Sequence, residues 1–133
     1  MTDIAATLGL AALEEWETVR RLRQDVFAVY ERGLAGIPGI RFVGGGQTDR
    51  VHAAWLCTVL VKDRLQLQRK LREHRIESNQ VHYRNDRYTL FRGFSGTFPN
   101  MDAVENDYLV LPLHTRMKVE DADKVVRVIR SGW

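Results

Sequence analysis

The chain has 133 residues, of which 44% are hydrophobic and 28% charged, and its formal net charge is +3. This length suits one compact domain and is too short for two, so we expect residues 1–133 to share a single core. The composition is that of a folded globular protein and excludes a low-complexity or disordered chain. The arginines are dispersed from Arg20 to Arg130. They favour a mild attraction to phosphates and do not predict a nucleic-acid-binding protein.

The sequence contains no segment that predicts a membrane span or a secretory signal. The longest apolar run, residues 51–61, is interrupted by His52 and Thr58. It is also shorter than the roughly 20 residues that a membrane helix requires. The first residues place no basic region ahead of an apolar one. We therefore expect a cytoplasmic protein with no membrane partner.

The first third of the chain predicts two helices. Thr2 and Asp3 can cap a short and very apolar helix, in which residues such as Leu8 recur at helical spacing. This first helix requires a partner surface to cover it. Over residues 16–34 the apolar residues keep one face of a second helix hydrophobic for about five turns. The glycines and the proline of residues 36–39 end that helix.

The middle of the chain predicts a strand followed by a third helix. Residues 52–62 are rich in Val, Leu, Trp and Thr, which favours a strand at the centre of its sheet. Asp63 can cap the third helix, which carries Leu67 and Leu71 on one face. A short extended stretch at residues 76–81 follows it.

The last third predicts a long loop, a strand and a final helix. Residues 83–100 form an irregular segment, and a loop of this length is often functional. A helical turn is expected at residues 101–105, a second strand at 108–113 and a terminal helix at 119–131. The order of elements predicts an α+β fold, in which a small antiparallel or mixed sheet is covered mainly on one side by helices.

Isolated reactive residues give little support for catalysis. Cys57, the single cysteine, is expected in the core. His52 and His74 have no neighbours at metal-ligand spacing, so we expect no metal. The glycines at residues 44–46 lack the Gly-Lys-Ser/Thr ending of a phosphate-binding loop. His114, at a strand end, can either reach a cleft or bond a nearby carbonyl. The residues therefore predict no catalytic set.

One cluster of polar groups stands out at the start of the long loop. It consists of seven consecutive residues: His82, Tyr83, Arg84, Asn85, Asp86, Arg87 and Tyr88. Its mixture of ring donors and arginines suits a sugar or a phosphate. In a second interpretation, Tyr83 and Tyr88 pack the loop onto the sheet while Arg84 and Asp86 form surface ion pairs. The residues alone leave both interpretations open.

Three stretches of the chain together resemble the DegT/DnrJ/EryC1/StrS family of aminotransferases. They are residues 1–6 with Gly9, Leu10, Leu13, Arg23 and Tyr30; Val81-His82-Tyr83 after Arg75-Ile76-Glu77; and Leu109–His114 ahead of the last helix. The resemblance covers nearly the whole chain in the order of the family's C-terminal small domain. It implies a fold like the small domain of fold-type I aminotransferases.

The resemblance also implies an activity. Members of the family use pyridoxal 5′-phosphate to transfer an amino group, commonly from glutamate, to a nucleotide-linked keto sugar. Their products enter surface polysaccharides and antibiotic sugars. On this basis a nucleotide sugar is the expected ligand, and its substrate-binding residues would be His82, Tyr83, Arg84, Asn85 and Tyr88.

Two features depart from the family pattern. Ala12 stands where the family often has glutamine, and residues 84–86 stand where many members have a proline and a second histidine. The Schiff-base lysine, the aromatic residue that stacks on the cofactor and the phosphate-binding groups are expected ahead of Met1. None of the four lysines matches that lysine: Lys62, Lys70, Lys118 and Lys124.

A lysine aldimine lets this cofactor act as an electron sink, so the isolated chain is expected to be inactive and not to bind the cofactor covalently. Its expected partner is an aminotransferase large domain or a homodimer partner. A different hypothesis is a free-standing module that binds a nucleotide sugar or another phosphorylated ligand through the basic loop.

Overall fold

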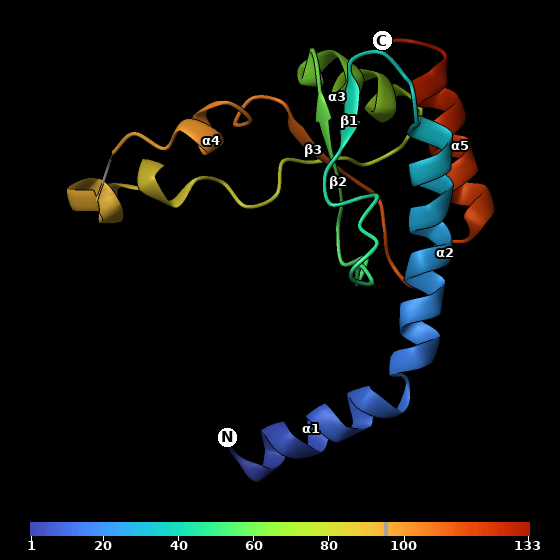
Figure 1. Ribbon diagram of the computed structural model, residues 1–133, viewed down its shortest axis with the longest axis vertical. Coiled ribbons are helices and arrows are strands. Elements are labelled where there is room, and N and C mark those ends of the chain that lie inside the picture. The colour runs from blue at the N-terminus through green and yellow to red at the C-terminus, as the bar shows by residue number, and fades with distance from the viewer. Residues whose placement is uncertain (95) are drawn as a thin grey trace.

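The computed structural model describes residues 1–94 and 96–133 (Figure 1). Its sheet has three antiparallel strands in the order β1-β2-β3. The strands are β1 (Ile40–Phe42), β2 (Cys57–Val61) and β3 (Tyr108–Leu111). Val59 at the middle of β2 pairs with Phe42 on one side and Leu109 on the other. The strand expected at the centre of the sheet does lie there.

In the part of the chain that the structure describes, five α-helices surround this sheet or extend from it. They are α1 (Asp3–Glu14), α2 (Trp16–Leu34), α3 (Arg64–Glu73), α4 (Pro99–Asp102) and α5 (Val119–Arg130). Cys57, Val59 and Val61 of β2 are fully buried, while Thr58 and Leu60 between them are partly exposed. Helices therefore cover one face of the sheet and leave the other open, as the predicted α+β class requires. No helix in the described part of the chain is long and apolar enough to span a membrane.

The core forms where α2 and α5 pack against each other and against the sheet (Figure 1). Val26, Tyr30 and Leu34 of α2 are buried there, whereas Trp16 and Leu22 near its start are exposed. The apolar stripe predicted along α2 is thus covered only over its C-terminal half. The N-terminal half of the helix extends past the core.

The buried hydroxyl of Tyr30 forms a hydrogen bond that connects α2 to Pro112, the residue after β3. The Tyr30 hydroxyl donates to the Pro112 carbonyl oxygen at 2.9 Å. Burial raises the pKa of Tyr30, so the hydroxyl keeps its proton for this bond. The contact fixes the point at which the chain leaves the sheet toward α5.

Several element boundaries differ from the sequence predictions. The strand predicted over residues 52–62 begins only at Cys57, because Ala54 adopts a left-handed conformation with a φ of 51°. Strand β1 was not predicted, and residues 76–81 contribute only an isolated bridge between Asn79 and Val110. Asp63 precedes α3, but its side chain makes no capping hydrogen bond to that helix.

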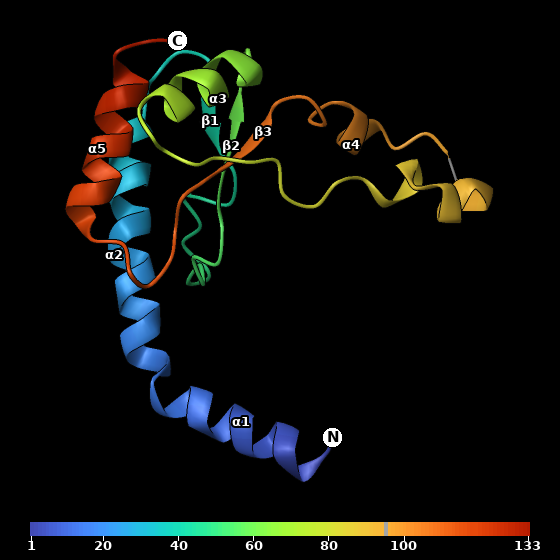
Figure 2. The same ribbon diagram turned by 180° about the vertical axis from the view of Figure 1, so that it is seen from behind.

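Two segments project from the core toward the same side of the α2–α5 pair (Figures 1 and 2). The first is α1, which has no buried residue and whose apolar side chains are exposed: Ile4, Leu8, Leu10 and Leu13. The second, here called the arm, comprises residues 82–94 and 96–107. Expected to be irregular up to residue 100, it contains two short 3₁₀ turns, at Asn85–Arg87 and Thr89–Phe94, and then α4. No residue of the arm belongs to the hydrophobic core.

Candidate functional site

The five predicted site residues line one hollow of about 680 Å³ on the arm. Among the described residues, the lining is formed by His82, Tyr83, Arg84, Asn85, Asp86, Tyr88, Phe98 and Met101. The first six come from the start of the arm, and the last two come from the region of α4. The structure therefore brings the sequence cluster together around a single cavity.

Arg84 is the centre of the arm, and its side chain is only 3% exposed. The guanidinium donates two hydrogen bonds to the Asp86 carboxylate, at 2.9 and 2.7 Å. It also donates to Asp102 and, at 2.8 Å, to Glu105. The ion pair with Asp86 was one of the two interpretations of the sequence, although the guanidinium is buried and does not lie on the surface. Arg84 thus joins the two ends of the arm.

These ion pairs determine the electrostatics of the hollow. The hydrogen bonds that Arg84 donates lower the pKa of Asp86, and having Asp86 and Asp102 as their acceptors raises the pKa of the guanidinium. Arg87 joins the same network through Glu105, at 3.1 Å. Two guanidiniums thereby face three carboxylates, so the charged groups joined here sum to −1.

The aromatic residues of the arm contact one another and stay open to solvent. The rings of Tyr83 and Tyr88 meet edge to face, with centroids 5.4 Å apart, and each residue is about half exposed. Phe98 lies beneath the Arg84 guanidinium, 5.8 Å from it. Rings held in this way offer apolar surface and two hydroxyl groups to a ligand.

His82 holds an uncommon backbone conformation at the start of the arm. Its φ is 64°, a left-handed value that costs energy for a residue other than glycine. The Tyr108 hydroxyl donates to the His82 carbonyl oxygen at 2.8 Å and anchors this conformation to β3. The ring of Trp55 lies 5.6 Å from that of His82. Trp55 was not singled out from the sequence, because only the tertiary fold brings it to the arm.

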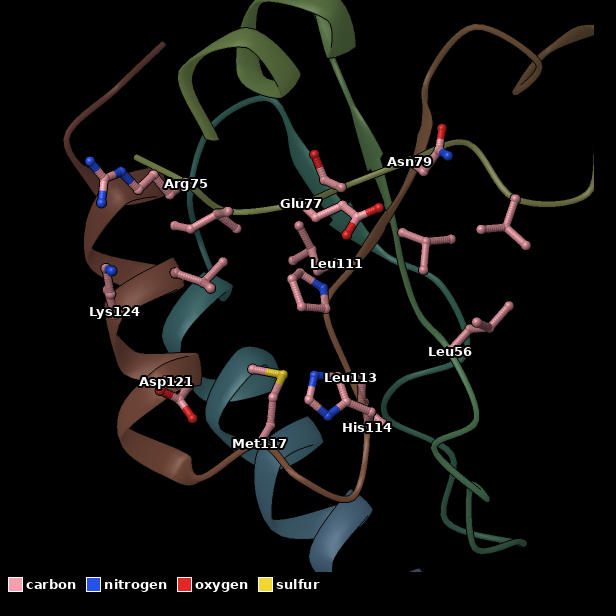
Figure 3. Close-up of a pocket in the computed structure, with 16 residues that line it drawn as sticks. Leu56, Arg75, Glu77, Asn79, Leu111, Leu113, His114, Met117, Asp121 and Lys124 are labelled. Carbon is pink, nitrogen blue, oxygen red and sulfur yellow. The ribbon is translucent and has the colours of Figure 1, made fainter. Parts of the chain in front are cut away.

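A second pocket of about 540 Å³ lies between β3, residues 75–79 and α5 (Figure 3). Its floor is apolar and includes Leu111 and Met117. In Figure 3, Arg75 and Lys124 lie on the α5 side and Leu56 on the opposite side. His114 lines this pocket, and its Nδ1 accepts a hydrogen bond from the Arg116 amide at 3.2 Å. The expected cleft position is therefore present, whereas the backbone partner of the ring is an amide and not the carbonyl that was the alternative expectation.

The other residues considered from the sequence have structural roles. Cys57 is buried in the core as expected, and burial raises the pKa of its thiol. His52 stacks on Phe27, with centroids 4.8 Å apart. The Gly46 amide donates to the Glu31 carboxylate at 3.0 Å, so a carboxylate already lies where a phosphate-binding loop would hold its anion. Within residues 1–94 and 96–133, no three His, Cys, Asp or Glu side chains cluster as metal ligands.

The fold matches that of a solved sugar aminotransferase. The family model of the DegT/DnrJ/EryC1/StrS aminotransferases matches residues 1–130, and the chain belongs to this family. The crystal structure of AtS13 from Actinomadura melliaura is 32% identical, covers 100% of this chain and has a TM-score of 0.89. That of the sugar aminotransferase CalS13 from Micromonospora echinospora is 30% identical over 94% of the chain, with a TM-score of 0.87.

The chain spans about a third of the length of these relatives. It covers 35% of AtS13 and 34% of CalS13. An uncharacterised protein of Methanocaldococcus jannaschii is 27% identical over 98% of this chain, which covers 36% of that protein. The chain is therefore comparable with one part of a complete aminotransferase.

Aminotransferases of this family use pyridoxal phosphate, but the described residues do not fit it. The cofactor needs a lysine amine for its Schiff base and positive groups for its phosphate. Among the residues described there, the arm hollow has no lysine in its lining, and its joined charges sum to −1. Lys70, on the other side of the core, donates to the Ser131 hydroxyl at 2.7 Å. Lys124 lines the second pocket beside the carboxylate of Asp121.

Proposed function

We propose that this chain supplies one wall of the active site of a pyridoxal-phosphate-dependent aminotransferase that acts on a nucleotide-linked keto sugar. The substrate-binding residues are His82, Tyr83, Asn85 and Tyr88, arranged around Arg84. The observation that carries the proposal is the single hollow formed by these five residues, on an arm that extends away from the core. Membership of the sugar aminotransferase family supports the choice of ligand.

The partner in this proposal is the large domain of an aminotransferase, in the same assembly or in a second copy. Leu8, Leu10 and Leu13 of α1 are each about two-thirds exposed. An apolar surface of this kind is typical of a segment that packs against another protein surface. Because α1 and the arm project toward the same side, one partner can contact both (Figures 1 and 2). The cytoplasmic location and the single domain stay predictions.

A first experiment tests whether the cofactor-binding lysine belongs to the large domain and not to this chain. The pure chain is mixed with pyridoxal phosphate and treated with borohydride, which reduces an internal aldimine to a stable adduct. We expect no adduct on this chain, and transamination only after addition of the large domain of a relative such as CalS13. A reducible aldimine on the chain alone would contradict the proposal.

A second experiment tests the hollow. Titration with UDP-glucose and dTDP-glucose compares the wild type with His82→Asn, since asparagine tolerates the left-handed backbone better than other residues. His74→Asn, at the end of α3 and outside the hollow, is the matched control. We expect weaker binding only for His82→Asn. Equal binding by both variants would remove His82 from the site.

The alternative function, a free-standing binding module, is supported by one observation, namely that the arm forms a hollow of about 680 Å³ from its own residues. A module should bind the nucleotide sugar equally well with and without a large domain. An aminotransferase wall should gain affinity when the large domain is added, because the cofactor side of the site is then complete. The same titration, repeated with the large domain, separates the two functions.

A further inference from the structure

The charge of the arm hollow limits which part of a ligand it can hold. From the sequence, the cluster at residues 82–88 suited a sugar or a phosphate. Arg84 is the cation that lines the hollow, but three carboxylates already surround it. With Arg87 included, the joined network keeps an excess of one negative charge. A diphosphate placed here would meet a like charge, and the Arg84 guanidinium already donates to Asp86, Asp102 and Glu105.

Trp55 does not line the hollow itself, but its ring contacts that of His82, which does. The residue is 64% exposed, yet its backbone is held in place from α2. Arg23 Nη1 donates to the carbonyl oxygens of Ala54 and Trp55, both at 3.2 Å, and Gln24 Nε2 donates to that of His52 at 3.2 Å. A large aromatic ring on a fixed backbone is thereby presented to solvent. Such an arrangement is typical of a ligand platform.

Backbone strain occurs on both sides of this ring contact. Ala54 has a φ of 51° and His82 a φ of 64°, and neither is glycine. These two residues place the rings of Trp55 and His82 with centroids 5.6 Å apart and planes at 49°. Strained residues persist where the surrounding structure over-determines them, and they cluster at ligand sites. The tilt makes the two rings a corner that is open to a third group.

The geometry points to an aromatic corner, formed by Trp55 and His82, that holds the uncharged carbohydrate ring of the ligand. This inference rests on the proposed function, and it assigns the sugar to the hollow and the diphosphate to a place outside it. The apolar C–H face of a sugar packs on the Trp55 ring, and the Tyr83 hydroxyl and the Asn85 amide bond its hydroxyl groups. Arg84 positions the arm and does not touch the ligand.

The indole N–H signals of the tryptophans allow a direct test in one NMR spectrum. Trp133 is an internal control, because its indole donates to the Lys62 carbonyl oxygen at 3.1 Å, at the C-terminus. Trp16 at the start of α2 is a second control, and Trp→Phe variants assign the signals. The probes are methyl glucoside, uridine, inorganic pyrophosphate and the two nucleotide sugars, each added to the full chain.

We expect methyl glucoside and the nucleotide sugars to shift the Trp55 signal and leave that of Trp133 unchanged. Pyrophosphate and uridine should shift neither. Trp55→Ala should weaken glucoside binding about tenfold, while Trp55→Phe, which keeps an aromatic face, should restore most of it. Trp16→Phe should bind as the wild type does.

The possible failures are distinguishable. If no probe shifts any signal, the proposed ligand-binding function of the arm fails together with this inference. If the nucleotide sugars bind but Trp55→Ala binds them equally well, only the aromatic corner is wrong. If pyrophosphate or uridine shifts Trp55 and competes with UDP-glucose, the hollow holds the nucleotide end of the ligand, and the assignment of the sugar is overturned.

Discussion

Replacing Arg84 by glutamine should open the arm while leaving the core folded. Glutamine keeps a polar amide side chain, although a shorter one, and removes the charge and the fork of five N–H donors. The change breaks the bonds from residue 84 to Asp86, Asp102 and Glu105 together. No residue of the arm belongs to the hydrophobic core, so the loss should stay within the arm.

The burial of the partners sets the size of the effect. Asp86 is 17% exposed, Glu105 23% and Asp102 43%, so water screens the last pair most. Removing one partner of a buried ion network is strongly destabilising. Because the three carboxylates are partly exposed, we expect a free-energy cost at the lower end of the range for buried networks. We expect the open population of the arm to rise roughly 100-fold. Arg87→Gln is the control, because Arg87 is half exposed and loses one pair, which predicts a rise of less than about fivefold.

Amide hydrogen exchange measures this opening at individual residues. The Ala103 amide donates to the Pro99 carbonyl oxygen at 3.0 Å and the Glu105 amide to that of Met101 at 2.9 Å, so both report on the closed arm. Their exchange should accelerate in Arg84→Gln, whereas amides of α5 should exchange as in the wild type. If the arm amides exchange equally fast in Arg84→Gln and Arg87→Gln, Arg84 is not the residue that holds the two ends of the arm together. Loss of protection in α5 would show that the arm supports the core.

Three further predictions concern the core and the pH response. Gly33→Ala should lower the free energy of unfolding by about 1–2 kcal/mol in urea titrations, because the new Cβ would lie 2.7 Å from Val126 Cγ1. Adding Val126→Ala to that variant should reverse the loss, because it removes the clash and leaves the higher helix propensity of alanine over glycine. Cys57 should react with a thiol reagent at least about 100-fold faster after unfolding, since burial shields the thiol and raises its pKa. Arg84 lowers the pKa of Asp86, so the contribution of the Asp86 carboxylate to arm closure should be complete above the ordinary aspartate pKa of about 3.9. This contribution should disappear as the pH falls through the lowered pKa. Asp86→Asn should abolish this pH dependence of the hydrogen exchange of the arm amides.

The helices and the two longer strands could be predicted because their signals are local. Periodic apolar residues mark α2 and α5, and β-branched residues mark β2. The start of β2 could not be predicted, because the hydrogen bonds from Arg23 to Ala54 and Trp55 join residues more than 30 positions apart. Strand β1 has only three residues, too few for any alternation to be recognised.

The candidate site also combines features that local sequence predicts with features that only long-range contacts determine. The contiguous residues from His82 to Tyr88 were predicted as one cluster, and all of them except Arg87 line one hollow. The burial of Arg84 depends on Asp102 and Glu105, which lie 18 and 21 residues further along the chain. Trp55 approaches His82 only because β2 pairs with β3. Local sequence therefore indicates which residues form the site, whereas tertiary contacts decide which of them remain available to a ligand.

The electrostatics of the arm also constrain the rest of a complete enzyme. Both a nucleotide sugar and pyridoxal phosphate carry phosphate groups, and a binding site must neutralise them with cations or backbone amides. In the arm, Arg84 already forms ion pairs with three carboxylates, and the joined network keeps a net negative charge. We therefore expect the phosphate-binding groups to come from the partner that contacts α1 and the arm. On this view the arm selects the neutral sugar, and mutation of its aromatic residues should change sugar preference more than affinity for the shared nucleotide.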